Sequence, residues 1–142
     1  MTTVFTNSRG QQVLSITQDG GNLTLSAGDL DDAFIRSVEI VGDFSLIGNP
    51  VKGGDFATPT ISLDGKTLTF EFATSNSGGG NKRFNDGDSF AFDFTGTGLT
   101  SATTHVQGFP WGSEKITASP IPEPGSILLG SIGLLLLLLR RR

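Results

Sequence analysis

The sequence predicts an all-β fold, a β-sandwich of immunoglobulin-like or jelly-roll-like type, followed by a single short C-terminal transmembrane helix. Several short segments alternate apolar and polar residues and are separated by Gly, Asn and Asp. With 11 Phe, 20 Gly and 17% charged residues, the chain is too apolar for disorder and unlike a helical bundle. Residues 127–139 contain only Ile, Leu, Gly and one Ser, which predicts the terminal helix.

The first predicted hairpin pairs Leu14 with Leu25 and Ile16 with Leu23, so that four apolar side chains share one face. Its turn is the sequence QDGG, whose glycines supply the positive φ that a tight turn needs. The period of two on both sides of this turn predicts that one face of the hairpin is buried.

The second predicted hairpin is built around Asp-Gly, a dipeptide favoured in two-residue type I′ turns. It places Ile61 opposite Leu68, and Phe70 and Phe72 continue the same apolar face. The intervening Thr and Glu side chains are then expected to face water.

Other segments bring the prediction to seven to nine short strands. FAFDF at 90–94 has the same period of two, VEI at 38–40 is another strand, and KITA at 115–118 is expected to be the last. DLDDAFIR at 29–36 is expected to form a short helical turn capped by Asp29. Turn signals about 8–12 residues apart favour a sandwich.

The chain therefore divides into four parts. We expect a β-sandwich domain at residues 1–116, an extended linker at 117–124, a transmembrane helix at 125–139 and a cytoplasmic Arg cluster at 140–142. A length of 142 residues suits one such domain and not two.

The charge balance and the rare residue types exclude several classes of function. Residues 1–121 carry 7 Lys and Arg against 13 Asp and Glu, a balance of −6. This acidic body repels phosphates, so nucleic acid is not an expected partner. With no Cys and one His, the chain has no disulfide, no thiolate nucleophile and no Cys-based or His-rich metal site.

The apolar run at 127–139 would rise about 20 Å as a helix, which is short of the ~30 Å core of a bilayer. Gly125 and Ser126 can enter the membrane, the Arg side chains of 140–142 can reach the headgroups, and the bilayer can thin locally. The positive-inside rule places the Arg cluster in the cytoplasm and the acidic body outside. A buried core helix is disfavoured because residues 134–139 are apolar all round.

The tail has three parts in order, which are the motif Pro122-Glu123-Pro124, the apolar run and the stop-transfer cluster Arg140-Arg141-Arg142. This order resembles the PEP-CTERM sorting signal of exported bacterial proteins. The resemblance implies that an exosortase, a membrane-embedded processing enzyme, recognises Pro-Glu-Pro and processes the tail. It also implies a Gram-negative-type envelope and often a role in extracellular polymer or biofilm matrix.

The physical character of the motif suits a processing signal. Two prolines fix φ and remove two backbone donors, so the motif is held extended, as a cleft of a processing enzyme requires.

Residues 1–30 contain neither the basic start nor the apolar run of a secretory leader. We therefore expect that a leader is missing from this chain.

Asp86 and Asp88, with Asp93 nearby, offer the oxygen ligands that calcium takes. The spacing differs from that of an EF-hand, because the last ligand position of such a loop would be Thr97 rather than Glu. We favour a turn between strands over a calcium site and expect no cofactor.

His105 lies in a predicted strand, THVQ at 104–107. A catalytic His needs a nucleophile and an orienting carboxylate, and the chain has no Gly-x-Ser-x-Gly. We therefore expect no enzymatic activity.

Phe109 and Trp111 flank Pro110 in the aromatic loop FPWG. Such rings can stack on sugars or plug the end of a sandwich, and the plug is the more usual place for a Trp. A glycan contact through Trp111 and Phe109 remains an alternative, which gains if the Trp111 ring is exposed beside other aromatics.

These observations favour an exported, non-enzymatic protein of the bacterial surface or extracellular matrix. We expect it in the cell envelope, anchored in the membrane with its body outside the cytoplasm, with release to the surface or matrix after processing. The expected partners are the membrane, an exosortase-like enzyme and exopolysaccharide. Two alternatives stay open: a carbohydrate-binding module that attaches to exopolysaccharide, and a permanent single-pass membrane protein that is not processed.

Overall fold

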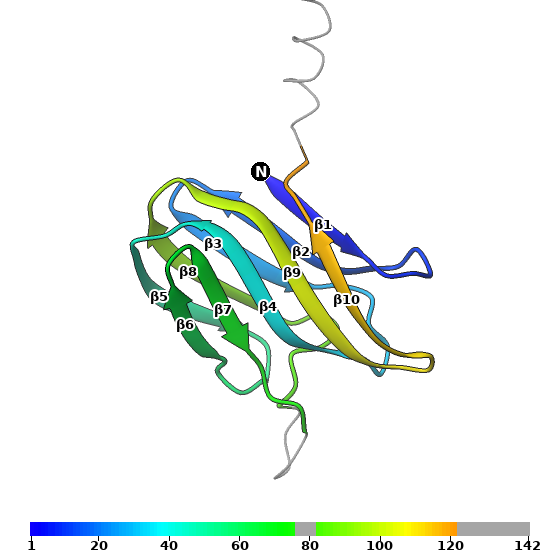
Figure 1. The fold of residues 1–142 in the computed structure, drawn as a ribbon. Helices are drawn as coiled ribbons and strands as arrows, with labels where there is room; N and C mark the ends of the chain where they lie inside the picture. The colour runs from blue at the N-terminus through cyan, green and yellow to red at the C-terminus, as the bar shows by residue number, and fades with distance from the viewer. Residues whose placement is uncertain (76–81, 122–142) are drawn as a thin grey trace, which may run out of the picture.

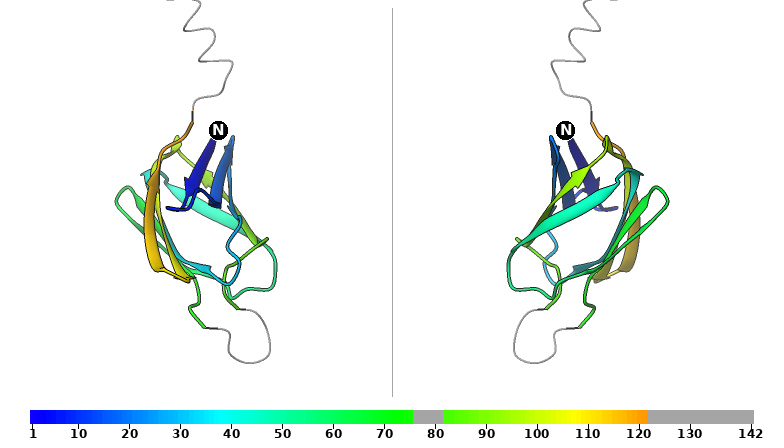
Figure 2. Two further views of the ribbon diagram at one scale, coloured as in Figure 1. Left: turned by 90° about the vertical axis from the view of Figure 1, so that its right-hand side faces the viewer. Right: turned by 90° about the vertical axis from the view of Figure 1, so that its left-hand side faces the viewer.

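Two five-stranded antiparallel β-sheets pack face to face in a computed structural model, which describes residues 1–75 and 82–121 (Figures 1 and 2). No helix occurs among the described residues, so the predicted all-β sandwich is confirmed for this part of the chain. The ten strands are β1 (Thr2–Thr6), β2 (Gln12–Asp19), β3 (Asn22–Ala27), β4 (Phe34–Asp43), β5 (Leu46–Gly53), β6 (Thr60–Asp64), β7 (Thr67–Glu71), β8 (Ser89–Thr95), β9 (Gly98–Phe109) and β10 (Gly112–Ala118).

The strand order places the first and last strands at the same side of the sandwich. Sheet A has the order β1-β2-β3-β8-β5, and sheet B has the order β10-β9-β4-β7-β6. Thr2 of β1 bridges Ile121, whose N–H donates to the Thr2 carbonyl at 3.0 Å. The start of β1 and the end of β10 therefore lie together at one end of the molecule (Figure 1).

Phenylalanine rings fill much of the space between the sheets. Phe90, Phe92 and Phe94 alternate with less buried residues along β8, so all three face inward. The ring of Phe70, on β7 of the opposite sheet, lies 5.9 Å from that of Phe90 and 5.2 Å from that of Phe92. These contacts join sheet A to sheet B, because offset and edge-to-face aromatic pairs attract one another.

The hairpin of β2 and β3 forms with a register that differs from the prediction by two residues. Ile16 pairs with Leu25 instead of Leu23. Only Gly20 and Gly21 lie between the paired ends of the two strands, and Gly20 has a φ of 57°. The predicted four-residue turn was wrong because a two-residue loop lets both strands extend further. The shift is even, so the same side chains remain on the buried face.

The hairpin of β6 and β7 differs in the same way. Ile61 pairs with Phe70 rather than Leu68, because the loop is Gly65 and Lys66 instead of Asp-Gly. Gly65 has a φ of 61°, which the first position of a type II′ turn requires. β6 is the edge strand of sheet B, and Ile61 is therefore 36% exposed although it lies on the inner side of the sheet.

The predicted helical turn at residues 29–36 does not form. The N–H of Ala33 donates to the carbonyl of Leu30 at 2.8 Å, and β4 begins at Phe34. Asp31 has a φ of 53°, a left-handed conformation that interrupts a right-handed helix. The apolar residues that follow are drawn into β4 by burial in the core.

The other predicted strands are present, as β8, β4, β9 and β10. β5 was not predicted, because Gly48 and Pro50 interrupt its apolar pattern. The register of β5 against β8 is irregular between Gly48 and Val51. An edge position tolerates such residues, since Pro cannot donate to a neighbouring strand.

The start of the expected linker belongs to the sandwich. β10 continues to Ala118, and Ile121 still pairs with β1, so residues 117–121 lie against the sheets. The rest of the linker, the expected transmembrane helix at 125–139 and the Arg cluster at 140–142 lie outside the described residues. Within the part of the chain that the structure describes, no helix has the length and hydropathy of a membrane span.

Candidate functional site

The turn between β9 and β10 holds the aromatic pair that the sequence singled out. The rings of Phe109 and Trp111 stack nearly parallel, with centroids 4.7 Å apart and an interplanar angle of 7°. Phe109 is 7% exposed and seals the end of the core, whereas Trp111 is 38% exposed. Phe109 therefore plugs the end of the sandwich, whereas Trp111 faces solvent, so the plug that was favoured for Trp111 is wrong.

Trp111 is held in place by Glu114 of its own hairpin and by Arg9 of the opposite sheet. Its Nε1 donates to Glu114 Oε2 at 2.8 Å, and the guanidinium of Arg9 lies 4.4 Å from the centre of the indole. Glu114 also accepts from the backbone N–H of Ser8 at 2.9 Å and from its hydroxyl at 3.1 Å. Arg9 and Ser8 lie in the turn between β1 and β2, so this network fixes the orientation of the indole.

The pKa of Glu114 reflects this network. Desolvation by itself raises the pKa, but the hydrogen bonds from Trp111 and Ser8, together with the charge of Arg9, outweigh it. The net effect lowers the pKa of Glu114 below its usual value, so the carboxylate stays ionised at neutral pH. The anionic form is the one that accepts all three hydrogen bonds.

A cleft of about 660 Å³ opens beside Trp111. Its lining includes Gln11, Asp31, Asp32, Phe109, Pro110 and Trp111. Phe109 and Arg9 both lie on the indole, so a ligand in this cleft would meet the part of the ring that they leave uncovered, together with carboxylate and amide groups that bind hydroxyls. Asp31 contributes to this cleft from a left-handed backbone conformation, which is unusual for a residue other than Gly.

The acidic segment that was weighed as a calcium site is a turn. Asp88 Oδ2 accepts from the N–H of Asn85 at 3.0 Å, and the N–H of Asp88 donates to the Asn85 carbonyl at 2.9 Å. Asp86 Oδ1 accepts from the N–H of Leu30 at 3.4 Å. Burial, followed by the nearby Asp55 and Asp86 charges, raises the pKa of Asp88 despite the hydrogen bond from Asn85.

Asp93 is engaged elsewhere, on β8. Its carboxylate accepts hydrogen bonds from the side-chain amides of Asn49 at 3.0 Å and Asn22 at 3.1 Å. Both bonds lower the pKa of Asp93, and the bond from Asn49 has the larger effect. The structure therefore does not bring Asp93 together with Asp86 and Asp88. Within residues 1–75 and 82–121, no three His, Asp or Glu side chains gather as metal ligands would.

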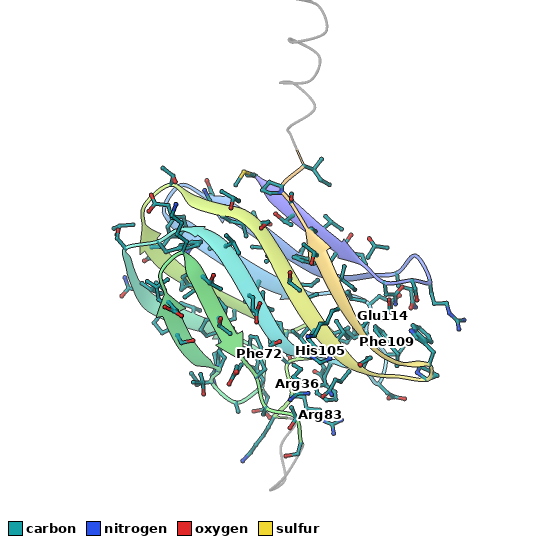
Figure 3. All side chains as sticks on the ribbon, viewed as in Figure 1. Arg36, Phe72, Arg83, His105, Phe109 and Glu114 are labelled. Atoms are coloured by element: carbon teal, nitrogen blue, oxygen red, sulfur yellow. The ribbon has the colours of Figure 1, made fainter. Side chains whose placement is uncertain are left out.

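His105 lies on the outer face of sheet B, as Figure 3 shows. In the register of the sheet it stands between Ser37 of β4 and Lys115 of β10. Partial burial, then the charges of Arg36 and Lys115, lower the pKa of His105 below its usual value. His105 could be found from its place in a predicted strand, but its charged neighbours could not, because their proximity depends on the pairing register of β4, β9 and β10.

The sorting motif at 122–124 and the Arg cluster at 140–142 lie outside the described residues. The structure does locate the point from which this tail departs, because Ile121 is bonded to β1 at the edge of the sandwich. Comparisons of the chain with protein-family models, with curated proteins and with solved structures find no match.

Proposed function

We propose that this chain is an exported, non-enzymatic protein of the bacterial surface or matrix, whose C-terminal tail is a sorting signal for an exosortase-type enzyme. The observation on which the proposal depends is the order of the last 21 residues: Pro-Glu-Pro, an apolar run and three terminal arginines. In this proposal residues 125–139 form the transmembrane helix, and the body is an immunoglobulin-like or jelly-roll-like sandwich outside the cytoplasm.

The described part of the chain supports a division between a folded body and a separate signal. The buried hydrophobic residues of the described chain lie between Phe5 and Phe109, in the strands and in the turns that join them. Ile121 makes the last described contact with the body, and the motif begins at the next residue. Cleavage beyond Ile121 would therefore remove the tail without removing any described core side chain.

The test is the intact mass of the mature protein from the envelope of a host that has an exosortase. The proposal predicts a shorter form that lacks the leucine run, and a Glu123→Ala variant that accumulates at full length. Ser126→Ala is the matched control, since it changes one small residue of the tail outside the motif and should be processed normally. A mature form that still ends at Arg142 would contradict the proposal.

The same experiment distinguishes a permanent membrane anchor. If the tail only holds the protein in the bilayer, then Glu123→Ala changes neither the mass nor the location of the protein. Wild-type protein would then remain in the membrane fraction at full length in hosts with and without an exosortase.

A carbohydrate-binding module is the second candidate, and the exposure of Trp111 favours it. The ring is 38% exposed and borders a cleft that also contains carboxylates, so a sugar in this cleft would contact the part of the indole that Phe109 and Arg9 leave uncovered. Because Trp111 is the chain's single Trp, its fluorescence reports directly on this cleft. Titration with matrix glycans should change the emission, and Trp111→Phe should weaken binding; absence of any response would exclude this candidate.

A further inference from the structure

A row of polar side chains crosses the outer face of sheet B. Ser37 of β4 pairs with Glu71 of β7 on one side and with His105 of β9 on the other, and His105 pairs with Lys115 of β10. Residues paired directly across strands point to the same face of a sheet. Four neighbouring strands therefore bring these four side chains side by side.

A β-bulge adds Arg36 to this row. Ile35 pairs with Val106 and Ser37 with the adjacent His105, so one extra residue of β4 lies between two consecutive pairs. Ile35 is fully buried, whereas Arg36 is exposed. A bulge interrupts the regular alternation of a strand and can change the face of the sheet toward which a side chain points. Figure 3 shows Arg36 and His105 close together at one end of sheet B.

These residues line a hollow of about 440 Å³. Phe72 and Thr74 complete its lining, and Phe72 is the single apolar member. A smaller hollow of about 90 Å³ adjoins it, where Glu39 and Thr103 also face His105. The surface thus offers two permanent cations, one imidazole, carboxylates and several hydroxyls within a small area.

The two cations in the hollow have no partner within the described part of the chain. The side chains of Arg36 and Lys115 make no hydrogen bond, ion pair or ring contact there, whereas Arg9 lies on Trp111 and Lys52 donates to the carbonyl of Phe56. In the larger hollow the two cations stand against one carboxylate, that of Glu71, so this hollow carries a positive excess in a body with a charge balance of −6. Burial first, and then the charges of both cations, lower the pKa of His105.

We propose that this hollow binds the carboxylate of a uronic-acid saccharide. The Arg36 guanidinium has the fork geometry that pairs with a carboxylate through two N–H donors, and Lys115 adds a second charge-assisted hydrogen bond. His105 offers a further ring N–H. The hydroxyls of Ser37 and Thr74 and the carboxylate of Glu71 are suited to exchange hydrogen bonds with the hydroxyls of the sugar.

The lining favours a saccharide over other carboxylate ligands. An acidic peptide would need pockets for apolar side chains, and Phe72, the one apolar residue of the hollow, is 5% exposed. Hydroxyl, carboxylate and imidazole groups spread over four strands match a ligand that carries a hydroxyl on most of its carbons. The proposal does not depend on the C-terminal tail, so it and the sorting proposal can fail separately.

The test is calorimetric titration of the full chain in non-ionic detergent with short oligogalacturonates, and with neutral galactose oligomers of the same length. We expect binding of the galacturonates alone, weakened by added salt. Arg36→Gln and Lys115→Gln should each reduce affinity about tenfold or more, because each removes a charge-assisted hydrogen bond. Lys66→Gln, which removes an equal charge from the β6–β7 loop of the same sheet, should bind like the wild type.

A second readout uses the single His of the chain. Galacturonate bound in the hollow should shift the NMR signals of the His105 ring and raise its titration midpoint, because the bound anion offsets Arg36 and Lys115. Glu39 and Glu71 also face these hollows, but they are present both with and without bound galacturonate, so they do not cause the expected change. The proposal is overturned if neutral oligomers or poly-glutamate bind equally well, if Lys66→Gln weakens binding as much as Arg36→Gln, or if the His105 signals do not move.

Discussion

Phe70 offers the sharpest test of the core, because its ring joins the two sheets. It is fully buried on β7 and contacts Phe90 and Phe92 of β8. Phe70→Ala removes a transfer free energy of about 1.5–3 kcal/mol and two ring pairs worth about 0.5–1.5 kcal/mol each. With incomplete collapse of the cavity, we expect a loss of about 3–5 kcal/mol in the free energy of unfolding.

Ile61→Ala is the matched control. Ile61 is the direct cross-strand partner of Phe70, but it is 36% exposed on the edge strand β6. Its truncation should therefore cost about 1 kcal/mol or less. Phe70→Leu, which retains part of the apolar volume, should fall between the two and remains measurable if Phe70→Ala does not fold.

Urea unfolding followed by far-UV circular dichroism, in the same detergent for all variants, gives the three free energies. The order of destabilisation should be Phe70→Ala, then Phe70→Leu, then Ile61→Ala. Equal losses for Phe70→Ala and Ile61→Ala would refute the assignment of these rings to a shared core between the sheets.

Three further predictions follow from single groups. Thr3 Oγ1 is buried without a hydrogen-bond partner in the described part of the chain, so Thr3→Val should raise the free energy of unfolding by about 1 kcal/mol; a loss of stability would show that the hydroxyl is satisfied. Glu114→Gln should lower stability by up to about 1 kcal/mol and change Trp111 emission, because an amide cannot accept all three bonds; unchanged emission would contradict the network. The pKa of folded His105 lies below the value of about 6.5 expected for the unfolded chain, so its contribution to stability is present above that pH and is lost as the pH falls through the folded pKa. An NMR titration of the His105 ring should show a midpoint below the usual range, and a midpoint above it would overturn this reasoning.

Local pattern was sufficient to predict the fold class and several strands. Alternation along FAFDF and VEI predicted strands that the structure contains, because burial of one face requires a period of two. Both hairpins were predicted, but the predicted pairing of their strands was wrong by two residues. The reason is that Asp19 and Asp64 belong to strands and not to loops. A turn dipeptide therefore indicates where the chain reverses direction, but it does not by itself determine which residues of the two strands pair.

The candidate sites were less predictable, because they depend on contacts between distant residues. Ser8 and Glu114 are 106 positions apart, and their bond exists only because β1 lies beside β10. Arg36 lies beside His105 because β4 has a bulge where it pairs with β9, and no local pattern in the sequence predicts that bulge. By contrast, Trp111 was identified from the sequence alone, since it is the one Trp in a Pro-containing turn.

Vesicle flotation of the purified full-length chain tests whether the C-terminal tail inserts into a membrane. After removal of detergent in the presence of phospholipid vesicles, we expect the chain to float with the lipid and to stay there in high salt, because an inserted apolar helix is held by burial and not by charge. If the full-length chain remains in the aqueous fraction, without affinity for vesicles or detergent, then the tail is not a membrane-targeting segment.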